Sequence, residues 1–441
     1  MVSLKVVENP PREEWESLVE RPSTDVTVFR ENVVPIIDDV LKEGDAAVSR
    51  YTAEFDGIDM DPDEFRVSED EIEKAYDLVD DDVLKALEIS VERVREFHER
   101  AYPGVGKDSW SLCVNGAECG VLIRPVEKVA CYVPGGRASY PSTAVMTVVP
   151  ASVAGCDEVI VITPPSKDDP LLVPAETLVA ADLSGADAVF RVGGVQAVAG
   201  VATGTETLPE VDKIVGPGNV YVTCAKLEVY ARGLVDVDMP AGPSEVLVVA
   251  DSSADPDELV LDIMAQAEHD PMSVSVLACS DGEVARETVR RLEKEVEDAP
   301  RAEVLRESLR NSLVVVFEDL DTCLEFANEF APEHLHLYVD RPEELLKKVR
   351  SAGAVFLGGD TTVPFGDYVT GPNHVLPTGG LAKARGALST LDFVKLIPFQ
   401  RVEPEALDEL ARVVETLAEV EGLPNHARAV RVRRSRGEDD A

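Results

Sequence analysis

Histidine is scarce in this chain of 441 residues, which contains six. Five of the six follow residue 268, and most stand in short polar motifs beside a carboxylate or an amide. Imidazole and carboxylate groups carry protons in enzymes and are the nitrogen and oxygen ligands of catalytic metals. The clustering therefore indicates a site that combines a metal ion with proton transfer. The motifs are Gln266-Ala-Glu-His269-Asp, Ala331-Pro-Glu333-His334-Leu, Phe365-Gly-Asp367-Tyr, Gly371-Pro-Asn-His374 and Leu423-Pro-Asn-His426.

The first motif places Gln266 and His269 three residues apart near the end of an expected helix, so the two share one face. Such a pair taken alone is more often a surface hydrogen bond than a metal site. It points to a metal only if Asp367 and His426 complete the set. A ligand set of nitrogen and oxygen without thiolates is typical of catalytic rather than structural zinc.

The second motif places two proton-transfer groups, Glu333 and His334, next to each other. Pro332 biases Ala331 towards an extended conformation. Neighbours on a regular strand point to opposite faces, whereas at a strand–loop junction both can reach one cavity. Two such groups suit a reaction with more than one deprotonation. The alternative is a surface strand, which we accept for His336 and not for His334.

Three glycine-rich turns follow expected strands, at the edge where doubly wound folds bind ligands. None matches G-x-G-x-x-G, so a dinucleotide would bind by another geometry. As bare sequence, ordinary turns are an equally good interpretation. The turns are Tyr132-Val-Pro-Gly135-Gly136, Val192-Gly193-Gly194-Val-Gln196 and Val215-Gly216-Pro-Gly218-Asn219.

The elements that must position these residues change type along the chain. Residues 1–119 carry helical apolar spacing and predict a helical N-terminal segment. From residue 120, short β-branched runs alternate with helical patterns, as expected for strands buried on both faces of a parallel sheet. We predict an α/β fold with two doubly wound lobes, over 120–239 and 240–388, and a helical C-terminal segment over 389–441. The expected strands cover 159–163, 188–192, 213–215, 246–250, 274–278, 313–317, 335–339 and 354–357.

The net charge of −42 is spread along the chain and argues against nucleic-acid binding, which needs a basic patch. It predicts a highly soluble surface or adaptation to a salt-rich cytoplasm, where the screening length falls to ~3 Å near 1 M salt. The one basic stretch, Arg428-Ala-Val-Arg-Val-Arg-Arg-Ser-Arg, is better explained as neutralising acidic neighbours.

Other counts exclude whole classes of protein. No run of ~18 apolar residues is present and the start lacks a secretory apolar core, so a cytoplasmic enzyme without a membrane span is expected. The seven cysteines are irregularly spaced, which argues against a disulfide framework and a four-thiolate zinc site.

Taken together, the motifs resemble the histidinol dehydrogenase family across nearly the whole chain. The resemblance implies oxidation of L-histidinol through L-histidinal to L-histidine with two NAD⁺ and one Zn²⁺ per subunit, the last step of histidine biosynthesis. It also implies two incomplete Rossmann-like lobes and an intertwined homodimer. The remaining motifs that carry it are Gly44-Asp-Ala-Ala-Val, Met239-Pro-Ala-Gly-Pro-Ser244-Glu and Asn373-His374-Val-Leu-Pro-Thr.

The resemblance further implies individual roles. His334 takes the alcohol proton and Glu333 activates water, while His374 shapes the site. Glu421 and His426 would come from the partner subunit. By resemblance, NAD⁺ meets Tyr132, Gln196 and Asn219; zinc is held by Gln266, His269, Asp367 and His426; and substrate meets Ser244, Glu421, His334 and the zinc ligands.

Two other classes of function are weighed against this one. A zinc hydrolase could use Glu333 as its base and would bind no NAD⁺, but the chain has no H-E-x-x-H motif. A non-catalytic binding protein would have no need of Glu333, His334 and all four expected ligands. One departure from the family pattern, around Leu381-Ala-Lys-Ala-Arg-Gly-Ala-Leu, has no functional explanation.

Overall fold

The computed structural model describes residues 4–21, 26–101, 109–135, 139–240 and 242–439. Gly136, in the first expected glycine turn, lies outside the described residues. The chain folds into two compact units. The larger unit comprises Met1–Tyr102 and Val126–Phe393, and the smaller comprises Pro103–Pro125 and Val394–Ala441.

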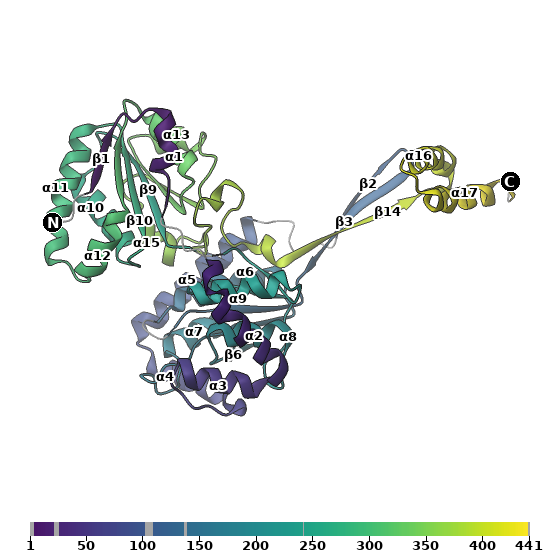
Figure 1. Ribbon diagram of the computed structural model, residues 1–441, viewed down its shortest axis with the longest axis horizontal. Helices are drawn as coiled ribbons and strands as arrows, with labels where there is room; N and C mark the ends of the chain where they lie inside the picture. The colour runs from purple at the N-terminus through teal and green to yellow at the C-terminus, as the bar shows by residue number, and fades with distance from the viewer. Residues whose placement is uncertain (1–3, 22–25, 102–108, 136–138, 241, 440–441) are drawn as a thin grey trace. The chain divides into compact units, whose positions relative to one another are not determined.

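Two parallel β-sheets form the frame of the larger unit (Figure 1). The first sheet has the order β6-β5-β4-β7-β8. Its order reverses at β4, because β5 and β6 follow on one side and β7 and β8 on the other. Its strands are β4 (Lys128–Tyr132), β5 (Glu158–Ile162), β6 (Ala188–Phe190), β7 (Lys213–Val215) and β8 (Asp236–Val237).

The second sheet has the order β1-β11-β10-β9-β12-β13, again with parallel pairing throughout. The mixed α/β fold with parallel sheets is thereby confirmed, as are all the runs expected to be strands. The strands are β1 (Lys5–Glu8), β9 (Glu245–Ala250), β10 (Val274–Cys279), β11 (Leu313–Val316), β12 (His334–Tyr338) and β13 (Ala354–Leu357).

Continuous apolar runs are needed because both faces of these sheets are covered. In β9, Val246 and Val248 pack into one core, while Leu247 and Val249 pack into the core on the opposite face. This alternation is the two-residue period of a strand, with helices on both sides.

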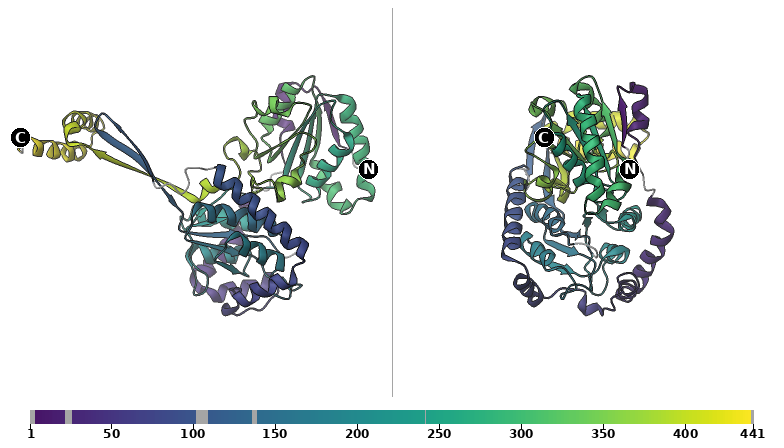
Figure 2. Two further views of the ribbon diagram at one scale, coloured as in Figure 1. Left: turned by 180° about the vertical axis from the view of Figure 1, so that it is seen from behind. Right: turned by 90° about the vertical axis from the view of Figure 1, so that its left-hand side faces the viewer.

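Helices cover the second sheet on both faces (Figure 2). One core takes apolar residues from α10 (Pro256–Ala267), α11 (Gly282–Asp298) and α12 (Ala302–Ser308). The other takes residues from α13 (Leu320–Phe330) and α14 (Pro342–Leu346). The short α15 (Val363–Tyr368) follows β13.

The first sheet is covered in the same way. Apolar residues of α2 (Arg30–Glu43), α3 (Asp45–Phe55), α8 (Gly194–Thr203) and α9 (Val220–Ala231) join one core with Ala130 and Ile160. Helix α6 (Pro141–Ala154) packs against β4 and β5, and α5 packs on α6. Helix α5 covers Asp81–Ala101. Helix α7 (Ala175–Ser184) packs on α5 and α6, and α4 (Glu69–Leu78) packs on α7.

Residues 1–119 contain several helices, but they also contribute β1 to the second sheet and, over 109–114 and from 117, strands to the smaller unit. In the second sheet β1 pairs in parallel with β11, and Trp15 of α1 (Trp15–Leu18) packs into the core beneath. The sequence gives little sign of β1, because an edge strand of four residues has too short a pattern to separate from a helix.

The smaller unit pairs antiparallel strands in the order β14-β3-β2 and adds two helices. The sequence did not predict β14, which contains Pro398; proline is tolerated there because β14 lies at the edge of the sheet. The elements are β2 (Ser109–Val114), β3 (Ala117–Pro125), β14 (Val394–Val402), α16 (Leu407–Val420) and α17 (Pro424–Asp439).

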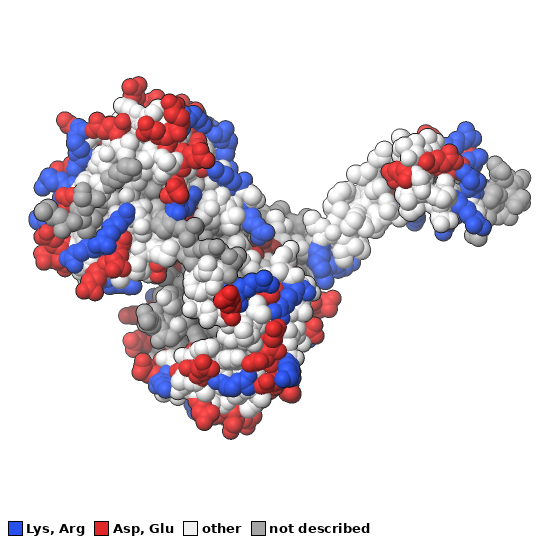
Figure 3. All heavy atoms as spheres, viewed as in Figure 1, with Lys and Arg blue, Asp and Glu red and all other residues white. Residues whose placement is uncertain are grey.

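The surface of the larger unit carries acidic side chains interspersed with basic ones on the face shown in Figure 3, rather than one acidic patch. Among the described residues, no helix is long and apolar enough to cross a membrane. The four ranges expected as domains and the Rossmann-like character of the lobes stay predictions.

Candidate active site

Glu333 and His334 converge at the start of β12. His334 is the first residue of the strand and Glu333 the last of the preceding turn, and both side chains are buried. The Nδ1 atom of His334 lies 3.5 Å from Oε2 of Glu333. The turn differs from the expectation in one respect, because Ala331 adopts a left-handed φ of 53° rather than an extended one. This conformation ends α13 and turns the chain sharply into β12.

The backbone of Glu245 holds both side chains. Its N–H donates to Oε2 of Glu333 at 2.7 Å, and its carbonyl lies 3.0 Å from Nδ1 of His334. Since a carbonyl can only accept, the proton of a neutral His334 belongs on Nδ1. The opposite nitrogen, Nε2, is left as the basic atom and lies 3.9 Å from Oδ1 of Asp367.

Charge around His334 is predominantly negative. Burial by itself lowers the pKa of this imidazole, but the neighbouring carboxylates of Glu333 and Asp367 outweigh burial and raise the pKa to about 9. In the protein alone, the pocket therefore favours a cation, either the imidazolium or a bound metal ion.

A cleft of about 1080 Å³ opens beside these groups, at the upper end of the usual size of small-molecule sites. It lies within the larger unit and takes residues from the end of α5, from β13, from α15 and from 370–392. Its polar lining includes His98, His334, Asp367, His374, Arg385 and Asp392.

The four expected metal ligands lie in different parts of the chain. Gln266 is buried in the last turn of α10, and its Nε2 has no hydrogen-bond partner among the described residues. His269 is exposed just beyond that helix, and Asp367 lines the cleft from α15. Thr362, before α15, donates to Asp262 of α10 at 2.5 Å.

The fourth expected ligand, His426, belongs to the smaller unit, where it is exposed in the first turn of α17. Within the described ranges, no three His, Cys, Asp or Glu side chains lie close enough together to hold a metal. The grouping of Gln266, His269, Asp367 and His426 stays a prediction.

A small cavity of about 90 Å³ lies between the parts of the larger unit that are built on the first and the second sheet. Gly216 and Pro217, from the third glycine turn, line it together with Ser244 and Glu333. The cavity therefore brings a turn expected to bind NAD⁺ beside the expected water-activating carboxylate.

The residues expected to contact NAD⁺ lie at or shortly after the carboxyl ends of three strands of the first sheet, β4, β6 and β7. Tyr132 ends β4 at the point where the strand order reverses, and its hydroxyl accepts from the N–H of Gly194 at 3.1 Å. Gln196 lies buried in the first turn of α8, and Asn219 caps α9 while remaining exposed. Carboxyl ends at such a reversal are where open α/β sheets bind ligands.

A buried ion pair that the sequence reasoning missed fixes the third glycine turn. Lys226 of α9 contacts Asp238 and donates to the carbonyl of Gly216 at 2.8 Å. Asp238 accepts from the N–H of Gly216 at 2.7 Å. Gly216 has φ 109°, and a Cβ there would lie 2.2 Å from the carbonyl oxygen of Tyr132. The available signal was a lysine in α9, a helix whose residues are mostly apolar.

The remaining histidines divide between core and cleft. The expectation that His336 lies on a strand surface is wrong: β12 is paired on both sides and covered on both faces, and His336 is fully buried. Its Nδ1 lies 3.1 Å from Asp262, and its Nε2 lies 2.8 Å from the Gly358 carbonyl. His374 contacts the carbonyl of Asp367 at 2.9 Å and lines the cleft, consistent with a shaping role.

His98, which was not singled out, also lines the cleft and lies 3.3 Å from the hydroxyl of Thr390. Burial lowers its pKa to about 4, so it is neutral at physiological pH. A histidine on the buried face of an amphipathic helix was the only sequence signal.

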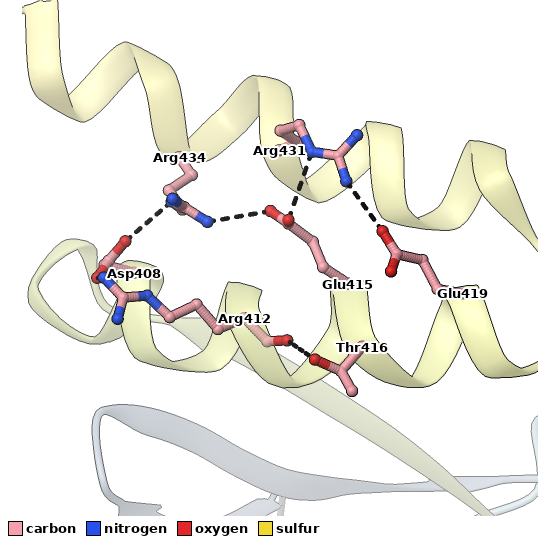
Figure 4. Close-up of polar contacts among 7 residues, drawn as sticks. All are labelled: Asp408, Arg412, Glu415, Thr416, Glu419, Arg431 and Arg434. Atoms are coloured by element: carbon pink, nitrogen blue, oxygen red, sulfur yellow. Dashed lines mark hydrogen bonds and ion pairs between the residues drawn. The ribbon is translucent and has the colours of Figure 1, made fainter.

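In the smaller unit, α16 and α17 form a hairpin whose tip carries Glu421 and His426, both exposed. Gly422, with φ 70°, makes the turn between them. Ion pairs join the two helices (Figure 4), which confirms that basic residues of the terminal stretch contact acidic neighbours. Arg431 pairs with Glu415 and Glu419, and Arg434 pairs with Asp408 and Glu415.

Comparisons with known proteins agree along nearly the whole chain. A family model described as histidinol dehydrogenase matches residues 19–434. The histidinol dehydrogenase of Methanopyrus kandleri is 55% identical over 435 residues, covering 98% of this chain and 100% of that protein. The protein of the same name from Methanocaldococcus jannaschii is 44% identical, covering 98% of each. A crystal structure of histidinol dehydrogenase from Elizabethkingia anophelis has a TM-score of 0.91 at 35% identity, covering 98% of both chains.

Proposed function

The chain belongs to the histidinol dehydrogenase family, and we propose that it oxidises L-histidinol through L-histidinal to L-histidine with two NAD⁺ and one Zn²⁺ per subunit, the last step of histidine biosynthesis. The observation that carries the proposal is the convergence of Glu333 and His334 on the backbone of Glu245, beside a large cleft. Two different proton acceptors at one place suit two successive oxidations. The test is the number of NADH formed per L-histidinol.

In the first oxidation, His334 takes the proton of the substrate alcohol at Nε2 while the carbinol carbon gives its hydride to NAD⁺. The hydrogen bond from Nδ1 to the Glu245 carbonyl supports this role, because it keeps Nε2 facing the reacting oxygen. The product of the step is the aldehyde.

In the second oxidation, Glu333 takes a proton from water as the water oxygen attacks the aldehyde carbon, giving the hydrate in its singly ionised form. The hydrate then gives a second hydride to NAD⁺ and becomes the carboxylic acid. The hydrogen bond from the Glu245 N–H to Glu333 supports this role, because it fixes the position of the carboxylate that would take the proton.

The residues around the cleft fit a zinc ion. The carboxylates of Glu333 and Asp367 close to His334 leave a surplus of negative charge that favours a bound cation, and the proposed ligands offer the nitrogen and oxygen donors that catalytic zinc binds. We propose that Gln266, His269 and Asp367 of one subunit and His426 of its partner hold the metal. When bound, zinc would orient the amine and imidazole of the substrate and, as a positive charge, favour the neutral form of nearby imidazoles.

For NAD⁺ we propose contacts with Tyr132, Gln196 and Asn219, supported by their position after the carboxyl ends of β4, β6 and β7. For the substrate we propose contacts with Ser244 and with Glu421 of the partner, besides His334 and the metal ligands. We also interpret the two lobes as incomplete Rossmann-like domains over 120–239 and 240–388.

A homodimer is proposed because the smaller unit exposes apolar side chains that a monomer would leave in water. Trp110, Leu112 and Val114 lie on one face of β2, and Leu396 and Ile397 are exposed on β14. Figure 3 shows that the face in view of this three-stranded sheet is largely free of charged side chains. Contiguous exposed apolar surface marks an interaction site. A second copy would cover it and bring its helical hairpin, with Glu421 and His426, to the first copy's cleft.

The last part of the proposal concerns the surroundings in which the enzyme works. We propose a cytoplasmic enzyme that binds neither nucleic acid nor membrane, and whose acidic surface is suited to high salt. The net charge of −42 supports this proposal, because self-repulsion at low ionic strength opposes folding.

A further inference from the structure

The side chain of Glu245 forms a second set of contacts that the proposed reaction does not use. Its Oε1 lies 2.7 Å from Nε of Arg21 and accepts from the N–H of Gly379 at 2.9 Å. Both partners of this ion pair are largely shielded, with 14% of the Arg21 side chain and 2% of the Glu245 side chain exposed. Removing one partner of a buried pair leaves an uncompensated charge.

Arg21 also reaches the turn that precedes the two proposed catalytic residues. Its guanidinium donates to the carbonyl of Phe330 and, at 3.3 Å, to that of Ala331, and it stacks 3.7 Å above the centre of the Phe330 ring. Ala331 is the residue with a left-handed φ, a conformation that a residue with a Cβ adopts only when its surroundings enforce it.

The arginine therefore connects the two structures that hold the catalytic groups. On one side it fixes the turn that leads into Glu333, and on the other it fixes the residue whose N–H and carbonyl hold Glu333 and His334. Its positive charge also compensates the Glu245 carboxylate, which would otherwise repel that of Glu333. Burial raises the pKa of the Glu245 carboxyl; Arg21 and the N–H of Gly379 lower it, and the nearby Glu333 raises it.

We propose that Arg21 and Glu245 form a positioning pair that sets the location of Glu333 and the orientation of His334 for catalysis. This inference rests on the proposed function. The second oxidation needs the water-activating carboxylate to be correctly placed against the aldehyde. The proposal therefore predicts that replacing Arg21 lowers the rate of the second oxidation more than it weakens substrate binding. A merely structural ion pair would affect stability alone.

The test uses the full-length, zinc-loaded protein and the variants Arg21→Gln, Arg21→Lys, Glu245→Gln and the double variant Arg21→Gln/Glu245→Gln. NADH formation is measured with L-histidinol and with L-histidinal, and the folded fraction of each variant is determined by urea unfolding. Arg21→Gln should lower kcat with L-histidinal on the order of 10- to 100-fold per folded molecule, with KM within about twofold.

Arg21→Lys should recover part of that loss, since lysine keeps the charge but cannot also reach both carbonyls. The double variant should exceed Arg21→Gln in kcat, because the uncompensated carboxylate is gone. A matched control is Arg232→Gln, which breaks the pairs of Arg232 with Glu228 and Asp38 in the other lobe. The control should lose stability with kcat unchanged.

Equal kcat per folded molecule in Arg21→Gln and Arg232→Gln would overturn the positioning role. A wild-type protein without histidinol-dependent NADH formation would instead contradict the proposed function. The positioning claim then rests on imidazole ¹⁵N NMR of the zinc-free chain, in which the His334 signals are assigned by their loss in His334→Gln. Arg21→Gln should change the Nδ1–H signal of His334 and Arg232→Gln should not; unchanged signals in both would refute the pair.

Discussion

Oε2 of Glu333 lies 3.5 Å from Nδ1 of His334, although residues adjacent on a regular strand point to opposite faces. The arrangement is possible because the strand begins at His334, so that Glu333 still belongs to the turn. The two proton-transfer groups thus lie side by side, His334 lining the large cleft and Glu333 lining the small cavity, which is the geometric basis of the two oxidations proposed.

Glu333→Gln should separate those oxidations. The amide keeps the shape of the side chain but cannot take a proton from water, so the rate with L-histidinal should fall about 10²- to 10⁴-fold. Formation of the aldehyde from L-histidinol should be affected much less, which rapid-quench measurement of both products will check. Glu325→Gln, an exposed change on the preceding helix, is the control and should leave both rates unaltered. Equal loss of both oxidations in Glu333→Gln would contradict water activation by this residue.

Lys226→Met should destabilise the protein strongly. It leaves Asp238, which is buried against the third glycine turn, without its cation, and breaking such a pair costs about 3–5 kcal/mol. Urea unfolding measures the loss, and the KM for NAD⁺ should rise because the turn loses its anchor. Lys213→Met is a milder comparison, since the partner Asp236 is exposed and can be solvated. A Lys226→Met protein as stable as the Lys213→Met protein would contradict this account.

Stability should depend on pH through Asp56, whose pKa burial raises to about 6. Because the folded pKa lies above the unfolded value, the folded state favours the protonated form. The contribution is therefore present below about pH 4 and is lost as the pH rises through 6. Asp56→Asn should increase the free energy of unfolding relative to wild type, with a gain that grows from about pH 4 to about pH 6 and then levels off.

The control for this prediction is Asp59→Asn, which changes the net charge equally at an exposed position nearby. Unfolding of all three proteins by urea across the pH range separates the two effects. A gain that is the same at every pH, or equal in both variants, would show that desolvation of Asp56 is not the cause.

Salt should stabilise the protein if self-repulsion of its acidic surface matters. With a net charge of −42, the Tm should rise between dilute buffer and molar KCl, where the screening length falls to ~3 Å. Potassium sulfate at equal ionic strength serves as the comparison, because exclusion of sulfate would raise Tm further than screening does. A Tm that does not rise in KCl would count against adaptation to high salt.

Much of the frame could be predicted from the sequence because it depends on local pattern. The run over 246–250 is apolar at every position, short and rich in valine, which favours a strand covered on both faces, and β9 is such a strand. Glu333 and His334 were also recognisable, since unlike proton carriers at a strand–loop junction suggest a shared cavity. These signals need no knowledge of what lies across the fold.

The remainder depends on partners distant in sequence. The burial of His336 follows from the position of β12 inside the sheet and from Asp262 on α10, neither of which a local pattern contains. The same holds for Arg21, whose partner begins the strand β9, and for β1 and β14, whose pairing strands lie far along the chain. A charged residue at the first position of an apolar run, as at Glu245, was the one available hint.

The most direct test of the central claim is the stoichiometry of NADH against L-histidinol. The full-length protein, loaded with zinc and assayed in dilute and molar KCl with excess NAD⁺, should form about two NADH for each L-histidinol consumed, with L-histidine as the product. Removing the metal by chelation should abolish the reaction and adding Zn²⁺ should restore it. One NADH per L-histidinol, or a rate indifferent to removal of the metal, would contradict the proposed function.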